Sequence, residues 1–248
     1  MMTDSPFFAT PTFATIEKLK QGKIEKVDHY RLTWNNFLLI TNYHDHETFI
    51  LLTNGVRLVI KRPLKQVLRD FSQINHCYTR CSIPYYEILG ERNPIKAYVA
   101  GRNLLVPSMG TNNAEVVYYM AKPLQTHYYS EQQEGMVLMF ETDNHAFNIL
   151  IPAYHNKFEK ILAQADEISH MQLVEIREQV QRYGLETESN CYGNQYHQQA
   201  KLNEQVYEIK RHVYGYVFNT LHESLYGERL SDEAMKRLLD ILFDTWKR

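Results

Sequence analysis

The spacing of the apolar residues changes at Pro152, and this change constrains the fold more than any other feature of the chain. Before Pro152, short apolar runs alternate with turn residues; after it, apolar residues recur every three or four positions, as on one face of a helix. Strands followed by helices are typical of an α+β architecture. We therefore expect an antiparallel β-rich N-terminal part with one inserted basic helix, followed by a C-terminal helical part. The expected boundaries are a flexible tail at residues 1–22, a β-rich domain at 23–153 and a helical region at 154–248.

Tight turns join the expected strands. Asn54-Gly55 separates the apolar runs ETFILLT and VRLVIK, and asparagine followed by glycine is the strongest short hairpin signal because both central residues need a positive φ. A second hairpin is expected at Ala100-Gly101 and a third at Asp143-Asn144-His145. Successive strands joined by such short turns pair antiparallel.

The inserted helix follows Pro63, a residue suited to the first helical position. Lys65 and Arg69, one turn apart, flank its apolar face. The helix can therefore pack one side on the sheet and present a basic edge to solvent. Its apolar positions are Leu64, Val67, Leu68 and Phe71.

Four helices are expected after Pro152. The spacing of apolar residues predicts that the first helix extends to Ile168. Ser169 with Gln172 resembles a capping box and predicts the start of a second helix, which is expected to end at Gly184. A polar connection then leads to a longer helix that ends at Gly227. Ser231, followed by acidic residues in the first turn, caps the last helix.

Positive charge is concentrated between Arg57 and Arg102, although the whole chain has a net charge of only −2. This stretch holds nine basic residues against three acidic ones, a local charge of +6. Most charge runs are simply solvated, but a basic cluster on a rigid scaffold is also the usual footprint of nucleic-acid binding. Arginine in particular is favoured in the narrow minor groove of A·T tracts. The candidate DNA-contacting residues are Lys61, Arg62, Lys65, Arg69, Arg80, Arg92, Lys96 and Arg102.

Two cysteines raise the question of a metal site. Cys77 and Cys81 have a spacing that structural zinc sites use, with His76 adjacent, but the only other cysteine is Cys191 in a polar connection. A closed zinc site needs four ligands. We therefore interpret residues 74–86 as a loop with ordinary thiols and expect no metal.

A second candidate for metal binding is the segment YHDHE. His44 and His46 would lie on the same face of an extended strand, as some metal sites require. A polar turn between two apolar strands is the simpler interpretation.

No pattern of enzyme chemistry is present. The sequence lacks a G-x-S-x-G nucleophile motif, a P-loop and a dinucleotide-binding G-x-G-x-x-G, so we expect neither an enzyme nor a cofactor. The N-terminus lacks the features of a signal peptide, no apolar run approaches the ~20 residues of a membrane helix, and an odd number of cysteines favours a reducing compartment. We expect a cytoplasmic protein without membrane contact.

Tyrosines occur in adjacent pairs at 85–86, 118–119 and 128–129. Exposed tyrosines could stack on bases. In alternating strands, one tyrosine of each pair would face the core and the other the surface, which is common in sheets and favours packing over base stacking.

Four segments together resemble the competence transcription factor ComK family of Gram-positive bacteria. They are KRPLKQVLRD, NHCYTRCSIPYYEIL, NPIKAYVAGRNLLVPSMG and HAFNILIPAYHNKFEKIL, in this order and at similar separations within residues 50–165. The chain departs from the family at Cys77, Cys81, Ile83 and Pro84, where small and basic residues are usual, and at Val116-Val117, where a tryptophan is expected.

The resemblance implies a DNA-binding transcriptional activator of genes for DNA uptake. Family members bind paired A·T-rich boxes of double-stranded DNA, largely through the minor groove, as dimers that pair into tetramers. RNA polymerase and a proteolytic adaptor are further implied partners, although the adaptor's degradation motif is not recognisable at residues 218–230. By position, the segment Lys61 to Arg69 and the loop around Tyr78 and Arg80 fall in the shared region.

Two alternatives to this interpretation stay open. A cytosolic protein-interaction or regulatory module without DNA binding would use the basic stretch to meet an acidic partner. A metalloenzyme would use His44 and His46 or the cysteine pair. The long apolar stripes of the C-terminal helices favour self-association, so we expect a homo-oligomer.

Overall fold

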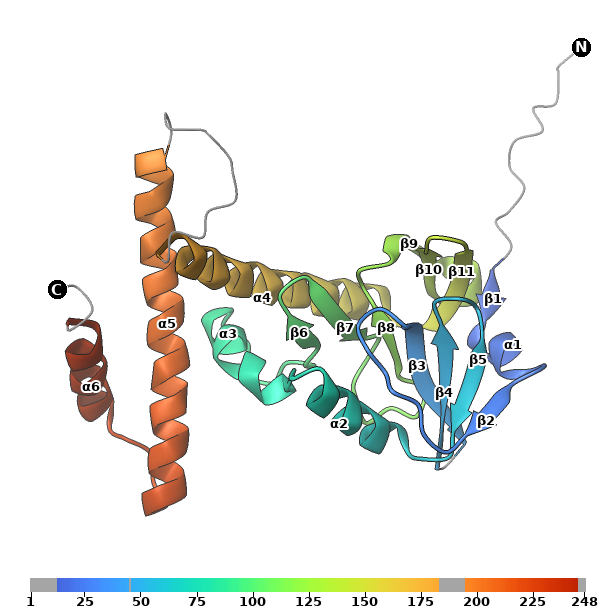
Figure 1. Ribbon diagram of the computed structural model, residues 1–248, viewed down its shortest axis with the longest axis horizontal. Helices are drawn as coiled ribbons and strands as arrows, with labels where there is room; N and C mark the ends of the chain where they lie inside the picture. The colour runs from blue at the N-terminus through green and yellow to red at the C-terminus, as the bar shows by residue number, and fades with distance from the viewer. Residues whose placement is uncertain (1–12, 45, 183–194, 245–248) are drawn as a thin grey trace, which may run out of the picture. The chain divides into compact units, whose positions relative to one another are not determined.

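The computed structural model describes residues 13–44, 46–182 and 195–244 (Figure 1). The chain forms two compact units, and each is assembled from two stretches: residues up to Thr79 with Ile95–Ala165, and Arg80–Pro94 with Asp166 onward. The expected α+β class is confirmed, because strands dominate up to Pro152 and long helices follow.

The units do not follow the single boundary expected near residue 153. Residues 80–94 belong with the C-terminal helices because α3 (Ile83–Ile88) packs on α5 (Gln195–Tyr226). The start of α4 (His155–Arg182) belongs with the strands, and its Phe158 and Ile161 are buried there. Periodicity identifies helices but not the surface on which they pack.

Two sheets form the first unit. The larger has the strand order β2-β5-β4-β3-β8-β7-β6 and the smaller β1-β11-β10-β9. Neighbouring strands pair antiparallel, as expected, except β2 with β5 and β1 with β11, which are parallel. The strands are β1 (Ala14–Thr15), β2 (Glu25–Val27), β3 (Phe37–His44), β4 (Glu47–Leu52), β5 (Arg57–Ile60), β6 (Tyr98–Ala100), β7 (Asn103–Pro107), β8 (Val117–Met120), β9 (Leu124–Ser130), β10 (Gly135–Glu141) and β11 (Ala146–Pro152).

The hairpins expected from turn chemistry are confirmed. β4 pairs with β5, β6 with β7, and β10 with β11. The β6–β7 turn lies at Gly101-Arg102, one residue later than expected, and Asn54 does not have the positive φ expected of it. Gly55 and Gly101 have φ values of +82° and +56°, a region that glycine enters without steric cost.

The helix α2 (Leu64–Ile74) covers one face of the larger sheet (Figure 1). Its expected apolar positions are all buried in one cluster with strand residues that include Phe37, Ile50 and Tyr118. On the opposite face of β8, Tyr119 stacks on Phe158 of α4 with ring centroids 5.3 Å apart. Both faces of this central strand are therefore covered.

Residues 14–20, expected within a flexible tail, instead form β1 and α1 (Ile16–Lys20). The Thr15 side chain accepts a hydrogen bond from the Lys18 backbone N–H at 3.2 Å and caps this short helix. Ile16 and Leu19 are buried. These apolar residues show no regular spacing in the sequence, but they lie at the edge of the hydrophobic core.

The helix break expected at Ser169 is wrong, because α4 runs without interruption from His155 to Arg182. Ser169 is buried in the middle of this helix. A serine inside a helix can bond a carbonyl one turn earlier, so a serine with a downstream glutamine is not unique to a helix start. Gly184, its expected stop, lies outside the described residues.

The end of α5 and the start of α6 lie where expected. Gly227 follows α5 with φ +79°, and Ser231 caps α6 (Asp232–Asp244) by accepting a hydrogen bond from the Ala234 N–H at 3.3 Å. None of the helices in the described ranges is both long and apolar enough to cross a membrane.

Candidate nucleic-acid interface

The exposed edge of α2 carries the cationic residues expected from the sequence. Lys65 and Arg69 are both exposed, four residues apart, and neither has a carboxylate at ion-pair distance among the described residues. The buried face of the helix fixes the position of this edge because Phe71 packs edge-on against Trp34, Phe37 and Tyr98. Two unneutralised charges therefore stand on a rigid support.

The charges just before α2 are partly neutralised. Lys61 Nζ lies 3.1 Å from an Asp28 carboxylate oxygen, and Arg62 Nη1 lies 2.6 Å from an Asp70 carboxylate oxygen. The Lys61 and Asp28 side chains are 55% and 76% exposed, so their attraction is weakened by solvent. Both residues remain accessible cations, but they add less positive potential than the sequence count implies.

The segment 28–32 runs along this helix and was missed by sequence reasoning. Asp28 pairs with Lys61, His29 Nδ1 lies 3.5 Å from Arg62, and the Leu32 carbonyl accepts a hydrogen bond from Asn75 at the end of α2. Between these contacts, Tyr30 and Arg31 are exposed, and Arg31 has no carboxylate partner in the described residues. No local sequence signal links Arg31 to a helix that starts at Leu64.

Lys96 and Arg102 lie at the edge of the same unit, around the hairpin of β6 and β7. Tyr98 and Ala100 pack against the cluster that contains α2, whereas Ala97 and Val99 are buried on the other face. Lys96 is half-buried and lies two residues before β6. Arg102 is exposed in the turn of the hairpin.

Arg80 and Arg92 belong to the second unit. Both side chains are exposed: Arg80 lies in the short 3-10 helix Thr79–Ser82, and Arg92 lies in the segment after α3. The expected cluster is thus divided between two units, and the α2 edge, Lys96 and Arg102 are the candidates that remain in the first unit.

Residues 74–86, expected to be a loop, contain a 3-10 helix and α3 instead. Pro84 lies at the start of α3, where its missing N–H is not needed. Cys77 is buried and Cys81 is exposed, and neither forms a disulfide bond within the described residues. Burial, with a smaller contribution from Cys77, raises the pKa of the Tyr98 phenol to about 12.

No group of three or more histidine, cysteine or acidic side chains in the described part of the chain is arranged to hold a metal ion. His44 is exposed at the end of β3, and Asp45 and Cys191 lie outside the described residues.

Two of the three tyrosine pairs do not alternate as expected. Tyr118 and Tyr119 are both buried because each face of β8 is covered, and Tyr85 and Tyr86 are both buried because they lie on a helix. Tyr128 alone among these pairs is classed as exposed, at 39%. The first two pairs are core residues, and base stacking by them is excluded by burial.

A buried polar network joins the helices of the second unit. The Tyr85 hydroxyl donates a hydrogen bond of 2.9 Å to the Glu175 carboxylate, and burial raises the pKa of both side chains. Lys210 of α5 forms an ion pair of 2.7 Å with Glu178 of α4. These contacts fix α3, α4 and α5 relative to one another.

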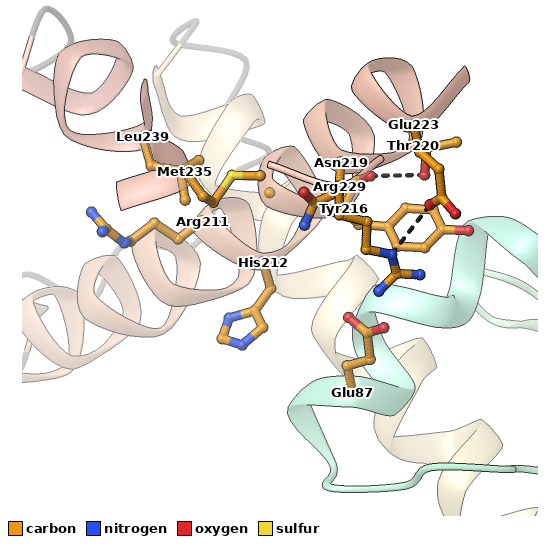
Figure 2. Close-up of a pocket in the computed structure, with 11 residues that line it drawn as sticks. Glu87, Arg211, His212, Tyr216, Asn219, Thr220, Glu223, Arg229, Met235 and Leu239 are labelled. Atoms are coloured by element: carbon orange, nitrogen blue, oxygen red, sulfur yellow. Dashed lines mark hydrogen bonds and ion pairs between the residues drawn. The ribbon is translucent and has the colours of Figure 1, made fainter. Parts of the chain in front are cut away.

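The second unit also contains a small pocket of about 250 Å³ between α5 and α6, with Glu87 entering from α3 (Figure 2). Its arginines are already paired: Arg211 with Asp240 at 2.8 Å and Arg229 with Glu223 at 3.2 Å. The arginines that line the pocket are therefore already neutralised by neighbouring carboxylates. We interpret the pocket as a gap in the packing of α5 on α6 rather than as a ligand site.

No protein-family model, curated protein or solved structure matches this chain.

Proposed function

We propose that this chain is a cytoplasmic transcriptional activator that binds A·T-rich double-stranded DNA and controls competence genes, as in the ComK family that it resembles. The observation that carries the proposal is the exposed edge of α2, where Lys65 and Arg69 lack carboxylate partners among the described residues. The edge is held by a helix whose other face is fully packed.

The spacing of the two cations suits a nucleic-acid backbone. Four residues of a helix rise about 6 Å, and phosphates follow one another every ~3.4 Å of axis along each DNA strand. Lys65 and Arg69 can therefore reach neighbouring phosphates of one strand. Phosphate contacts position a protein on DNA and make its affinity depend on salt.

Arginine at a projecting turn supports the preference for A·T-rich sequence. Arg102 occupies the turn between β6 and β7, and Arg31 lies exposed beside α2. A guanidinium on such a projection can enter a narrow minor groove, where A·T tracts strengthen the negative potential. Sequence selection would then depend on DNA shape more than on base contacts.

The resemblance supports the proposal through the placement of its four segments. They fall on the connection after β5 with most of α2, on the 3-10 helix with α3, on the β6–β7 hairpin, and on β11 with the start of α4. The most basic of them is the one that supplies the α2 edge.

Self-association through α5 and α6 completes the proposal. The apolar stripe of α5 is buried at Val206 and Ile209 but becomes exposed toward its C-terminus, with Leu221 at 54% and Leu225 at 74%. Ile241 of α6 is 69% exposed. Large exposed apolar residues in contiguous positions mark interaction surfaces. A second copy of the chain would double the number of phosphate contacts and sharpen selectivity.

The same exposed stripe favours a second candidate function, a protein-interaction module without DNA binding. In that case Leu221 and Leu225 would dock a different protein, and Lys65 and Arg69 would meet its acidic residues.

Binding to fluorescently labelled duplexes distinguishes these functions. Fluorescence anisotropy should show tighter binding to an A·T-rich duplex than to a G·C-rich duplex of equal length in the same salt. Equal affinity for both duplexes would contradict a preference for A·T-rich sequence. No binding to either duplex would contradict DNA binding and favour the second candidate, a protein-interaction module.

A further inference from the structure

A pocket of about 580 Å³ lies in the first unit, where loops of its two sheets meet. Small-molecule sites typically occupy roughly 300–1,000 Å³. Trp34 supplies aromatic surface, Phe37 is buried beneath it in the core, and most of the remaining lining is polar. The polar side chains include Asn35, Asn54, Asn144, Lys122, Glu141 and Asp143.

Hydrogen bonds tie the loops around this pocket together. The Thr142 hydroxyl donates to the Thr53 carbonyl at 3.3 Å, which joins the β10–β11 turn to the β4–β5 turn. Lys122 Nζ lies 3.5 Å from the Asn35 amide oxygen, and the Glu141 N–H donates to the Pro123 carbonyl at 2.9 Å. A rim held in this way loses little freedom when a ligand binds.

Trp34 forms a fixed aromatic wall. It is half-buried, and its ring packs against Phe71 of α2 with centroids 4.8 Å apart and planes at 82°. Because this contact holds the indole in one orientation, a planar ring can stack on it without first ordering it. Bases stack on aromatic side chains of this kind in nucleic-acid-binding proteins.

The polar side chains match the edges of nucleobases. Asparagine pairs with adenine through two hydrogen bonds, a carboxylate accepts from the amino group of cytosine, and lysine donates to guanine. Asn35, Asn54 and Asn144 lie among the lining residues together with both carboxylates. Enzymes that extrude a base read it in a similar pocket, by stacking and by its hydrogen-bonding edge.

We propose that this pocket binds the base of a nucleoside, stacked on Trp34 and read by the asparagines and carboxylates of the rim. The lining carries two carboxylates, Glu141 and Asp143, and one ammonium, Lys122, so the rim disfavours a polyphosphate. The preferred ligand is therefore a neutral nucleoside rather than a nucleoside triphosphate. The inference goes beyond DNA binding, because none of the lining residues belongs to the α2 edge.

Tryptophan fluorescence tests this site in the full-length chain. The sequence has two tryptophans, so Trp246→Phe leaves Trp34 as the sole reporter. Titration with adenosine, guanosine and cytidine should give a saturable change for at least one of them. ATP should bind roughly tenfold more weakly than adenosine. Isothermal titration calorimetry provides a second readout that is independent of Trp34.

Asn144 and Asn112 provide a matched pair of variants, since both are exposed asparagines in turns and only Asn144 lines the pocket. Asn144→Ala should weaken nucleoside binding by roughly tenfold, and Asn112→Ala should leave it unchanged. The proposal is overturned by the absence of saturable binding for every nucleoside, by equal effects of the two variants, or by saturation with glucose instead. None of these titrations contains duplex DNA, so their failure and the failure of DNA binding are separate results.

Discussion

Glu178 of α4 and Lys210 of α5 form an ion pair of 2.7 Å in which each side chain is only 11% exposed. Removing one partner of a buried ion pair typically costs about 3–5 kcal/mol. We expect Glu178→Ala to lower the free energy of unfolding by an amount in this range, measured by urea denaturation. Glu223→Ala, which breaks the exposed pair with Arg229, should cost about 0–1 kcal/mol. Similar losses in both variants would contradict a structural role for the buried pair.

Tyr119 and Tyr85 should respond in opposite ways to loss of the hydroxyl. The Tyr119 hydroxyl is buried with no hydrogen-bond partner in the described structure, whereas the Tyr85 hydroxyl donates to Glu175. An unsatisfied buried polar group costs about 1–3 kcal/mol. Tyr119→Phe should therefore raise the free energy of unfolding or leave it unchanged, and Tyr85→Phe should lower it. Destabilisation by Tyr119→Phe of more than about 1 kcal/mol would imply a partner for that hydroxyl.

Glu175 should make stability depend on pH. Burial, the largest cause, raises the pKa of this carboxyl above its ordinary value of 4.5, although the Tyr85 hydrogen bond and Lys210 oppose the shift. A raised pKa means that the folded state holds the proton more tightly than the unfolded chain. The stability that Glu175 contributes is therefore fully present below pH 4.5 and is lost as the pH rises through the pKa that Glu175 has in the folded state.

Glu175→Gln removes this titration while retaining an acceptor for Tyr85. The stability of the variant relative to the parent should increase as pH is raised from about 4 to 7, measured by urea denaturation at each pH. A difference that stays constant, or that decreases with rising pH, would show that the pKa of Glu175 is not raised.

The exposed stripe of α5 should control the oligomeric state. Leu221→Glu with Leu225→Glu places charge where a second copy is proposed to pack, and light scattering after gel filtration should then give the monomer mass. Thr126→Glu, a comparable change on the exposed edge strand β9, should leave the mass of the parent unchanged. A parent protein that is already monomeric would contradict the proposed self-association.

Features set by local chemistry could be predicted from the sequence. Asn54-Gly55 marked a hairpin, although only Gly55 has the positive φ expected of both residues, and the spacing of Leu64, Val67, Leu68 and Phe71 determined α2. Ser231 determined the start of α6 in the same way. In each case the signal and the structure lie within a few residues of one another.

Features set by tertiary contact could not be predicted. Lys61 is paired with Asp28, which lies 33 residues earlier in the chain, so the charge of the 57–102 stretch was overestimated. Tyr118 and Tyr119 are both buried because α2 lies over one face of β8 and α4 over the other. Ser169 looked like a cap because the sequence does not show that α4 has core contacts on both sides of it.

The division of the basic stretch between two units was also invisible in the sequence. Arg80 and Arg92 follow α3 into the second unit because α3 packs on α5, whose residues lie more than a hundred positions later. The sequence therefore located the cations along the chain but could not assign them to one surface.

The salt dependence of duplex binding tests the central proposal most directly. The dissociation constant of an A·T-rich duplex is measured against salt concentration for the parent, for Lys65→Ala with Arg69→Ala, and for Lys236→Ala with Arg237→Ala as a control of equal charge change on α6. Each lost phosphate contact lowers the magnitude of the log–log slope by about 0.9. We expect a decrease of about 1.8 in the α2 variant and none in the control. An unchanged slope in the α2 variant, or an equal decrease in both variants, would contradict binding of DNA by this edge of α2.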